Sequence, residues 1–323
     1  MFGKGLDFQF PILVTSFHQF CLMVVSSLVL YMKPSLRPTV NEPERPDRKM
    51  SFSQYLRIFK IDFFTYMKQI FPCSLSSSGD IGLSNVSFRF ISLSLYTMLK
   101  TSSLTFVLLF GLLFRLEKFN WRLVAIVLVM SGSVVMMVNK PDSQQADEST
   151  STGIILVLFA SMASGLRWSF TQLLLKRNSY TTNPISTIFY ISPSMCMILF
   201  VFGLIFEGWT NFMAANIWEI KGTLQTIVLM IIPGVLAFMM TLCEFKLLTV
   251  TQVITLSIAG IFKELLTIIL SSVIFGDKLS VINIMGLVLT FVDILWYNYY
   301  RYKENKEEYV RVIQEEIEMD YKK

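Results

Sequence analysis

Long stretches of apolar residues alternate with short polar segments along most of the chain. A transmembrane α-helix needs about 20 mainly apolar residues to cross the hydrocarbon core of a bilayer. By this measure the pattern predicts nine membrane-spanning helices, at 9–32, 65–88, 91–114, 121–138, 153–175, 184–206, 224–246, 251–275 and 280–300. We therefore expect an all-α, polytopic membrane protein with one transmembrane domain over residues 1–323 and a polar tail at 301–323.

Composition supports this class and excludes several others. The chain is 53% hydrophobic and 16% charged, whereas about 25% of residues are charged in ordinary soluble domains. Its four cysteines show no CxxC spacing, and its one histidine, His18, cannot supply a metal cluster or a Ser-His-Asp relay. The net charge of +5 is spread over loops and helix ends, which argues against nucleic-acid binding. We therefore expect neither an enzyme nor a bound metal or cofactor.

Charges between the apolar stretches predict the orientation in the membrane, because an excess of Lys and Arg marks the cytosolic side. The segment 33–60 is rich in Lys and Arg, whereas 139–152 and 207–222 carry more acidic than basic residues. We therefore predict that 33–60 is cytosolic and that the two acidic segments are lumenal. With nine spans, the N-terminus then lies on the lumenal side and the tail at 301–323 lies in the cytosol.

Basic residues deep inside predicted helices are the main functional candidates, because a charge at the centre of a membrane helix costs about 2.5–3.5 kcal/mol on insertion scales. The helix face of Lys263 also carries Ala259 and Gly260, which leave room for a neighbour or a ligand. Two further cations share a face with polar residues: Lys100 with Tyr96, Thr97 and Ser103, and Arg167 with Ser164 and Thr171. These stripes favour a cavity wall. The alternatives are a structural pair for Lys263 and anchoring at a membrane surface for Lys100 or Arg167.

Acidic residues in the same helices are expected to balance these cations. Asp80 shares one stripe of the 65–88 helix with several serines. Because an aspartate repels phosphate, we predict a structural or gating ion pair for Asp80 rather than substrate contact. Glu264, Glu244 and Asp293 invite the same interpretation, in which they neutralise basic residues when no anion is bound. Together, the deep cations predict a central cavity that accommodates an anion and passes it across the membrane.

An internal echo divides the chain into two halves. Lys100, an apolar run and the sequence FRLEK resemble Lys263, an apolar run and the sequence FGDK about 160 residues later. Half-chain repeats build many secondary transporters, which hold their substrate where the halves meet. We therefore divide the domain into a first half at 9–138 and a second half at 153–300.

Four motifs in order resemble one transporter family: DIGLSNVSF at 80–88, LYTMLKTSS at 95–103, GLRWSFTQ at 165–172 and LSIAGIFKE at 256–264. The chain resembles the triose-phosphate/nucleotide-sugar translocator branch of the drug/metabolite transporters from about residue 10 to 302. Within that branch it most resembles the GDP-fucose-transporter-like subgroup of solute carrier family 35 and its yeast relative. The resemblance implies ten helices in two inverted five-helix halves with both termini cytosolic. Because 10–18 looks like the second helix of the family, the first is missing here, and we expect a further span upstream of Met1.

The resemblance also implies an activity and a site. The activity is alternating-access exchange of a cytosolic nucleotide sugar for a lumenal nucleoside monophosphate in the Golgi or endoplasmic reticulum membrane. Lys263 matches a phosphate-binding lysine of the ninth helix, Arg167 a sixth-helix arginine and Lys100 a fourth-helix lysine. Glu264 and Gln172 stand where sugar-phosphate members have cations. The expected substrate-binding residues are Lys263, Lys100, Arg167, Tyr96, Ser103 and Thr171, and the expected gating or ion-pair residues are Asp80, Glu264 and Glu244.

The expected partners are the nucleotide sugar, the nucleoside monophosphate and the lipid bilayer, and a homodimer is left open. Two alternatives compete with this function. One is an exchanger of phosphorylated metabolites of the triose-phosphate type. The other is a membrane protein that kept the fold without transporting, such as a receptor or an assembly factor.

Overall fold

The computed structural model describes residues 10–33, 36–37, 61–100, 102–115, 120–138, 148–177, 180–181, 183–250, 266, 270 and 281–321. Throughout these ranges the regular secondary structure is helical, which confirms the predicted all-α class. Five described helices are long and apolar enough to cross a membrane, at Pro11–Met32, Leu95–Leu113, Thr150–Leu175, Pro184–Phe206 and Gly222–Leu247. The protein is therefore a polytopic membrane protein, as predicted.

The helices follow the predicted apolar stretches closely. Their bounds are α1 Pro11–Met32, α3 Phe63–Thr65, the π-helical turn η3 Tyr66–Ile70, α4 Phe71–Ser87, α5 Leu93–Lys100, α6 Ser103–Leu113, α7 Trp121–Val138, α8 Glu148–Arg177, α9 Pro184–Phe206, α10 Trp209–Met213, α11 Ile217–Ile220, α12 Gly222–Val250 and α14 Val281–Tyr321. The predicted span at 251–275 lies outside the described residues except for residues 266 and 270.

Two predicted boundaries differ from the structure. The stretch expected as one helix at 91–114 contains α5 and α6, and the N–H of Ser102 bonds the carbonyl of Leu99 at 3.1 Å in a tighter, three-residue turn; together the two helices make up the apolar stretch Leu95–Leu113 that is long enough to cross a membrane. The last predicted span and the tail form one continuous helix, α14, of 41 residues. The charged residues of the tail therefore extend a helix rather than begin a separate element.

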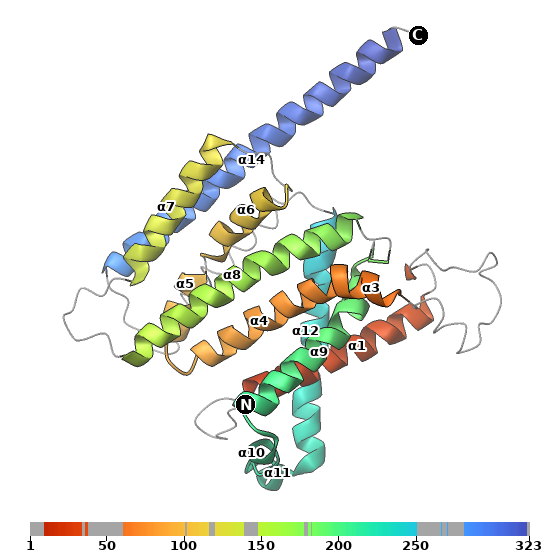
Figure 1. Ribbon diagram of the computed structural model, residues 1–323, viewed down its shortest axis with the longest axis vertical. Helices are drawn as coiled ribbons and strands as arrows, with labels where there is room; N and C mark the ends of the chain where they lie inside the picture. The colour runs from red at the N-terminus through yellow and green to blue at the C-terminus, as the bar shows by residue number, and fades with distance from the viewer. Residues whose placement is uncertain are drawn as a thin grey trace, which may run out of the picture.

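The long helices α8 and α9 lie antiparallel to each other (Figure 1). In the middle of the molecule α4 packs against α8 and α9, and α6 packs against α8. Below them α1 packs against α9 and α12, while α7 pairs with α14 on the far side of α8 (Figure 1). The division into halves at 9–138 and 153–300 stays a prediction; the contacts of α1 with α9 and of α4 with α8 join helices from both.

Small residues let the central helices approach closely. A Cβ atom added at Gly165 of α8 would lie 2.6 Å from the Cβ of Phe106 in α6, so only glycine fits there. On the neighbouring face, Gly79 of α4 would bring a Cβ within 3.8 Å of the Cβ of Ala163 in α8. Both contacts lie beside Asp80 and Arg167 in the sequence. Of the two, the Gly165 contact requires the missing Cβ, and it fixes how closely α6 approaches α8 beside the candidate site.

Candidate functional site

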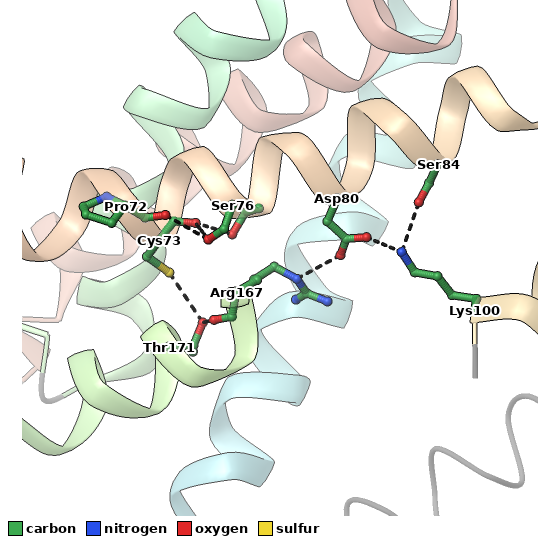
Figure 2. A network of polar contacts seen from close by, with 9 residues as sticks. Pro72, Cys73, Ser76, Asp80, Ser84, Lys100, Arg167 and Thr171 are labelled. Atoms are coloured by element: carbon green, nitrogen blue, oxygen red, sulfur yellow. Dashed lines mark hydrogen bonds and ion pairs between the residues drawn. The ribbon is translucent and has the colours of Figure 1, made fainter. Parts of the chain in front are cut away.

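Three charged side chains from three helices meet between α4, α5 and α8. Asp80 of α4 forms an ion pair through Oδ1 with Lys100 Nζ at the end of α5. Its other oxygen, Oδ2, accepts a hydrogen bond from Arg167 Nε of α8 at 3.2 Å. Ser84, one turn after Asp80, also accepts from Lys100 Nζ, at 3.2 Å. Figure 2 shows the single carboxylate between the two cations.

The serine-rich sequence of α4 explains how a polar helix face can line the protein interior. Ser76 Oγ donates to the carbonyl oxygens of Pro72 and Cys73 at 2.8 and 3.1 Å, and Ser77 Oγ donates to that of Cys73 at 2.7 Å (Figure 2). Bonds of this type satisfy the hydroxyl groups within their own helix. The hydroxyl groups of Ser76 and Ser77 are therefore satisfied within α4, which packs against α8.

Burial differs among the members of the charged cluster. The side chain of Asp80 is only 7% exposed, whereas those of Lys100 and Arg167 are 18% and 22% exposed. A buried charge is tolerated when a partner and hydrogen bonds compensate for lost hydration, and Asp80 has both. The cations outnumber the acid by two to one in this group and are the more accessible members. The arrangement can therefore present positive charge to an anion.

Aromatic rings flank the two cations. The Arg167 guanidinium carbon lies 4.8 Å from the ring centroid of Trp168, and Lys100 Nζ lies 6.0 Å from that of Tyr96. The Tyr96 ring in turn lies 4.4 Å from the ring of Phe88. Rings at these distances stabilise a cation without neutralising it. Sequence reasoning singled out Tyr96 and missed Trp168, although its position directly after Arg167 in a predicted membrane helix was a usable signal.

Two other predicted site residues lie differently from expectation. Thr171 is buried, and its Oγ1 donates to the Arg167 carbonyl at 2.8 Å and lies 3.6 Å from Cys73 Sγ, so its hydroxyl joins α8 to α4 (Figure 2). Ser103 begins α6, after the turn that ends α5 at Lys100. The face that Lys100 and Ser103 are expected to share stays a prediction.

The remaining predicted residues are not part of this cluster in the described structure. Glu244 is half-buried in α12, which packs against α1 and α9. Lys263 and Glu264 lie outside the described residues. Asp293 of α14 is 2% exposed, and its carboxylate has no hydrogen-bond partner among the residues that the structure describes. The binding and gating roles assigned to all of these residues, and the central cavity, stay predictions.

Comparison with known proteins establishes the family. A family described as purine nucleobase transmembrane transport matches residues 43–307. The protein named "Putative nucleotide-sugar transporter YMD8" of Saccharomyces cerevisiae is 34% identical over 363 aligned positions, covering 93% of this chain and 79% of its own length. The chain belongs to this family of drug/metabolite transporters. The resemblance inferred from the four motifs is thereby confirmed.

Other members of the family differ in what their names describe. A "Probable sugar phosphate/phosphate translocator" of Arabidopsis thaliana is 32% identical over 244 residues, covering 75% of this chain and 58% of its own length. "UDP-galactose transporter 1" of the same plant is 27% identical over 308 residues, covering 93% of this chain and 79% of its own length. Family membership indicates that this chain is a membrane transporter. It does not identify the substrate, because the members are named for different substrates.

Proposed function

We propose that this protein carries a nucleotide sugar across the Golgi or endoplasmic reticulum membrane in exchange for a nucleoside monophosphate, by alternating access. The observation that carries the proposal is the cluster of buried Asp80 with half-buried Lys100 and Arg167 between α4, α5 and α8. Two cations held deep among membrane helices need a purpose beyond stability, since each charge is costly there. Relatives named as nucleotide-sugar transporters suggest that purpose, because a nucleotide sugar carries negatively charged phosphates that the two cations can bind.

A diphosphate fits the two cations. An arginine guanidinium binds phosphate oxygens with two parallel hydrogen bonds, and a lysine ammonium adds a mobile point charge. In the described structure Asp80 is hydrogen-bonded to both Lys100 and Arg167. An incoming phosphate group therefore replaces the carboxylate as their counter-ion. When the substrate leaves, Asp80 forms its ion pairs with Lys100 and Arg167 again. Asp80 is thus the gating residue of the proposal.

Further residues complete the proposed site. By the motif LSIAGIFKE, Lys263 adds a third cation to the substrate site, and Glu264 and Glu244 balance it when the site is empty. Tyr96, Ser103 and Thr171 belong to the wall around Lys100 and Arg167. The site should bind with moderate affinity, because a substrate held tightly in one orientation is released slowly in the other.

The charge of the site favours phosphorylated substrates over free bases. The matched family is described by purine nucleobase transport, but a neutral purine offers no anionic group to Lys100 and Arg167. Exchange of a sugar phosphate for phosphate is the second candidate, favoured by the name of the translocator relative. It would use the same two cations without a nucleoside.

Reconstituted exchange decides among these functions. Purified protein in proteoliposomes is loaded with UMP, GMP or inorganic phosphate and offered UDP-galactose, GDP-mannose, triose phosphate or adenine, with the Lys100→Ala variant as the matched control. Uptake of a nucleotide sugar that depends on an internal nucleoside monophosphate and on Lys100 supports the proposal. Exchange of triose phosphate for phosphate alone supports the second candidate. Uptake of adenine alone, or of nothing by folded protein, refutes both.

The compartment is tested separately. A fluorescent fusion of the full chain should coincide with Golgi or endoplasmic reticulum markers in cells. Residence in the plasma membrane or a plastid envelope would contradict the proposed location and would move the function toward the exchange of phosphorylated metabolites.

A further inference from the structure

The first turn of α1 is capped by a residue from the opposite half of the chain. The N-cap residue Phe10 makes no side-chain cap, and Pro11 opens the helix. The Glu207 carboxylate, which directly follows α9, accepts hydrogen bonds from the backbone N–H groups of Ile12 at 2.8 Å and Leu13 at 2.9 Å. A negative carboxylate at a helix N-terminus is favourable both for the free N–H groups and for the helix dipole. Glu207 is 6% exposed, so this contact is buried.

The helices pack tightly just below this contact. A Cβ atom added at Gly203 of α9 would lie 2.6 Å from the Leu13 side chain, so α1 lies directly against the α9 backbone there. One turn further along α1, Ser16 Oγ donates to the Cys196 carbonyl at 3.0 Å. The two helices are therefore in direct polar and apolar contact over the first two turns of α1.

The segment after Glu207 fixes the backbone from which its carboxylate projects. Gly208 has φ of +78°, a left-handed conformation that favours glycine, and Asn211 Nδ2 donates to the Glu207 carbonyl at 3.2 Å. From there α10 and α11 fold beneath the start of α1 (Figure 1). The rings of Phe10 and Phe212 are 5.5 Å apart, edge to face, which covers the capped turn with apolar groups.

We infer that Glu207 is a reversible latch between α1 and α9, and that each transport cycle requires its release. The inference rests on the proposed function, because alternating access requires the two halves to separate at one end and then at the other. Its two sides come from the predicted halves 9–138 and 153–300, and the latch adjoins the segment 207–222, which the charge pattern predicts to be lumenal. Glu207 is thus a positioning residue for the lumenal gate.

A latch must open as well as close, and the energetics of Glu207 permit both. Burial raises the pKa of the Glu207 carboxyl, while the N–H groups of Ile12 and Leu13 and the nearby Arg89 charge act in the opposite direction. The latched carboxylate has therefore lost hydration that it recovers on release. Such compensation keeps the net strength of a hydrogen-bonded charge small compared with its gross interaction energy.

A contact in the first half of α9 offers a control. There the hydroxyl group of Tyr66 in η3 donates to the carbonyl oxygen of Tyr190 at 3.0 Å and also bonds the hydroxyl group of Ser194. This contact also joins the two predicted halves, but it is made by a neutral hydroxyl group and lies farther than Ser16 from the capped turn along α9. Tyr66→Phe therefore removes a contact between the halves without touching the Glu207 cap.

Cysteine accessibility tests the latch without any substrate. The reporter is Ser16→Cys in a chain whose four native cysteines are replaced by alanine, held in lipid nanodiscs and exposed to a charged maleimide. We expect Glu207→Ala to raise the labelling rate about tenfold, the effect of losing one charge-assisted hydrogen bond, and Tyr66→Phe to leave the rate unchanged. Labelling no faster in Glu207→Ala than in its parent, or raised equally by Tyr66→Phe, would overturn the inference. If Glu207→Ala does not fold, Glu207→Gln, which retains one acceptor oxygen, is judged by the same outcomes.

A reversible cross-link then links the latch to transport. Ser16 Oγ lies 3.7 Å from Cys196 Sγ, so Ser16→Cys in a chain that keeps Cys196 alone can be joined to it by an added oxidant. Nucleotide-sugar exchange in proteoliposomes should stop on cross-linking and return on reduction. Undiminished exchange by fully cross-linked protein would refute the latch. If the reduced protein exchanges no phosphorylated substrate while the labelling result holds, the proposed function fails and the latch remains.

Discussion

Replacing Asp80 should destabilise the protein more than replacing either of its partners, because this carboxylate serves two cations. Lys100→Met leaves Asp80 with Arg167 at 3.2 Å and removes one charge-assisted contact, worth about 1.5–3 kcal/mol. Asp80→Asn removes the ion partner of Lys100 and Arg167 together. Removing one side of a buried ion pair costs about 3–5 kcal/mol, and the Asp80 side chain is only 7% exposed.

The double variant Asp80→Asn/Lys100→Met provides the sharper test. It removes one of the two cations that Asp80→Asn leaves unpaired, so it should be more stable than Asp80→Asn alone, with a coupling of about 0.5–3 kcal/mol. The assay is the midpoint temperature at which purified protein loses its monodisperse gel-filtration peak in detergent. Ser84→Ala is the matched control, because it removes only the 3.2 Å contact with Lys100 and should shift the midpoint least.

Two results would refute this reasoning. One is an Asp80→Asn variant as stable as the parent protein, which would mean that solvent or lipid headgroups satisfy the two cations. The other is a double variant no more stable than Asp80→Asn, which would mean that Lys100 does not depend on the carboxylate.

Three further predictions follow from the site and the charge pattern. Arg167→Lys should lower nucleotide-sugar exchange about tenfold while the protein remains folded, because lysine keeps the charge but loses the planar, two-pronged donor geometry; undiminished exchange would argue against a phosphate contact. Lys263→Ala should lose exchange and nucleotide-induced thermal stabilisation, and full retention of both would remove Lys263 from the site. A cysteine placed in 139–152 should be protected from an impermeant maleimide in sealed vesicles whose cytosolic face is outward, whereas one in 33–60 should be labelled; the reverse pattern would invert the topology.

Much of the fold is readable from the sequence, because a bilayer demands long apolar stretches whatever packs around them. The bounds of α1 and α9 follow from this rule. The break between α5 and α6 does not, since it depends on a single tight turn at Ser102 within an apolar stretch. The sequence also did not predict that the last span and the tail form one helix. The charged residues of the tail mark the end of the apolar stretch, but a helix can continue past that point into water.

Pairing within the site was only partly predictable. The sequence indicated that Asp80 needs a cation, since a buried carboxylate is costly alone. It did not identify the partners, because Arg167 lies 87 residues away and the choice depends on how α4 meets α8. Glu207 was less visible still, since its partners are backbone N–H groups 194 and 195 residues away. One local signal exists: α1 begins after Phe10 without a Ser, Thr, Asp or Asn cap, so another group must satisfy its first turn.

The balance of charges around Asp80 offers a physical reason for the proposed exchange of substrates, as opposed to their free release. If Asp80 neutralised its partners completely, the closed intermediate would be as stable without substrate as with it, and the empty protein would reorient freely. Among the described residues of this cluster one carboxylate faces both Lys100 and Arg167, and in the proposed cycle an anion stabilises the closed, dehydrated intermediate more than Asp80 alone can. On this argument the second cation couples the two directions of transport. Neutralising it with Arg167→Gln should therefore raise uptake into vesicles without internal nucleotide relative to exchange, and an unchanged ratio would place the coupling elsewhere.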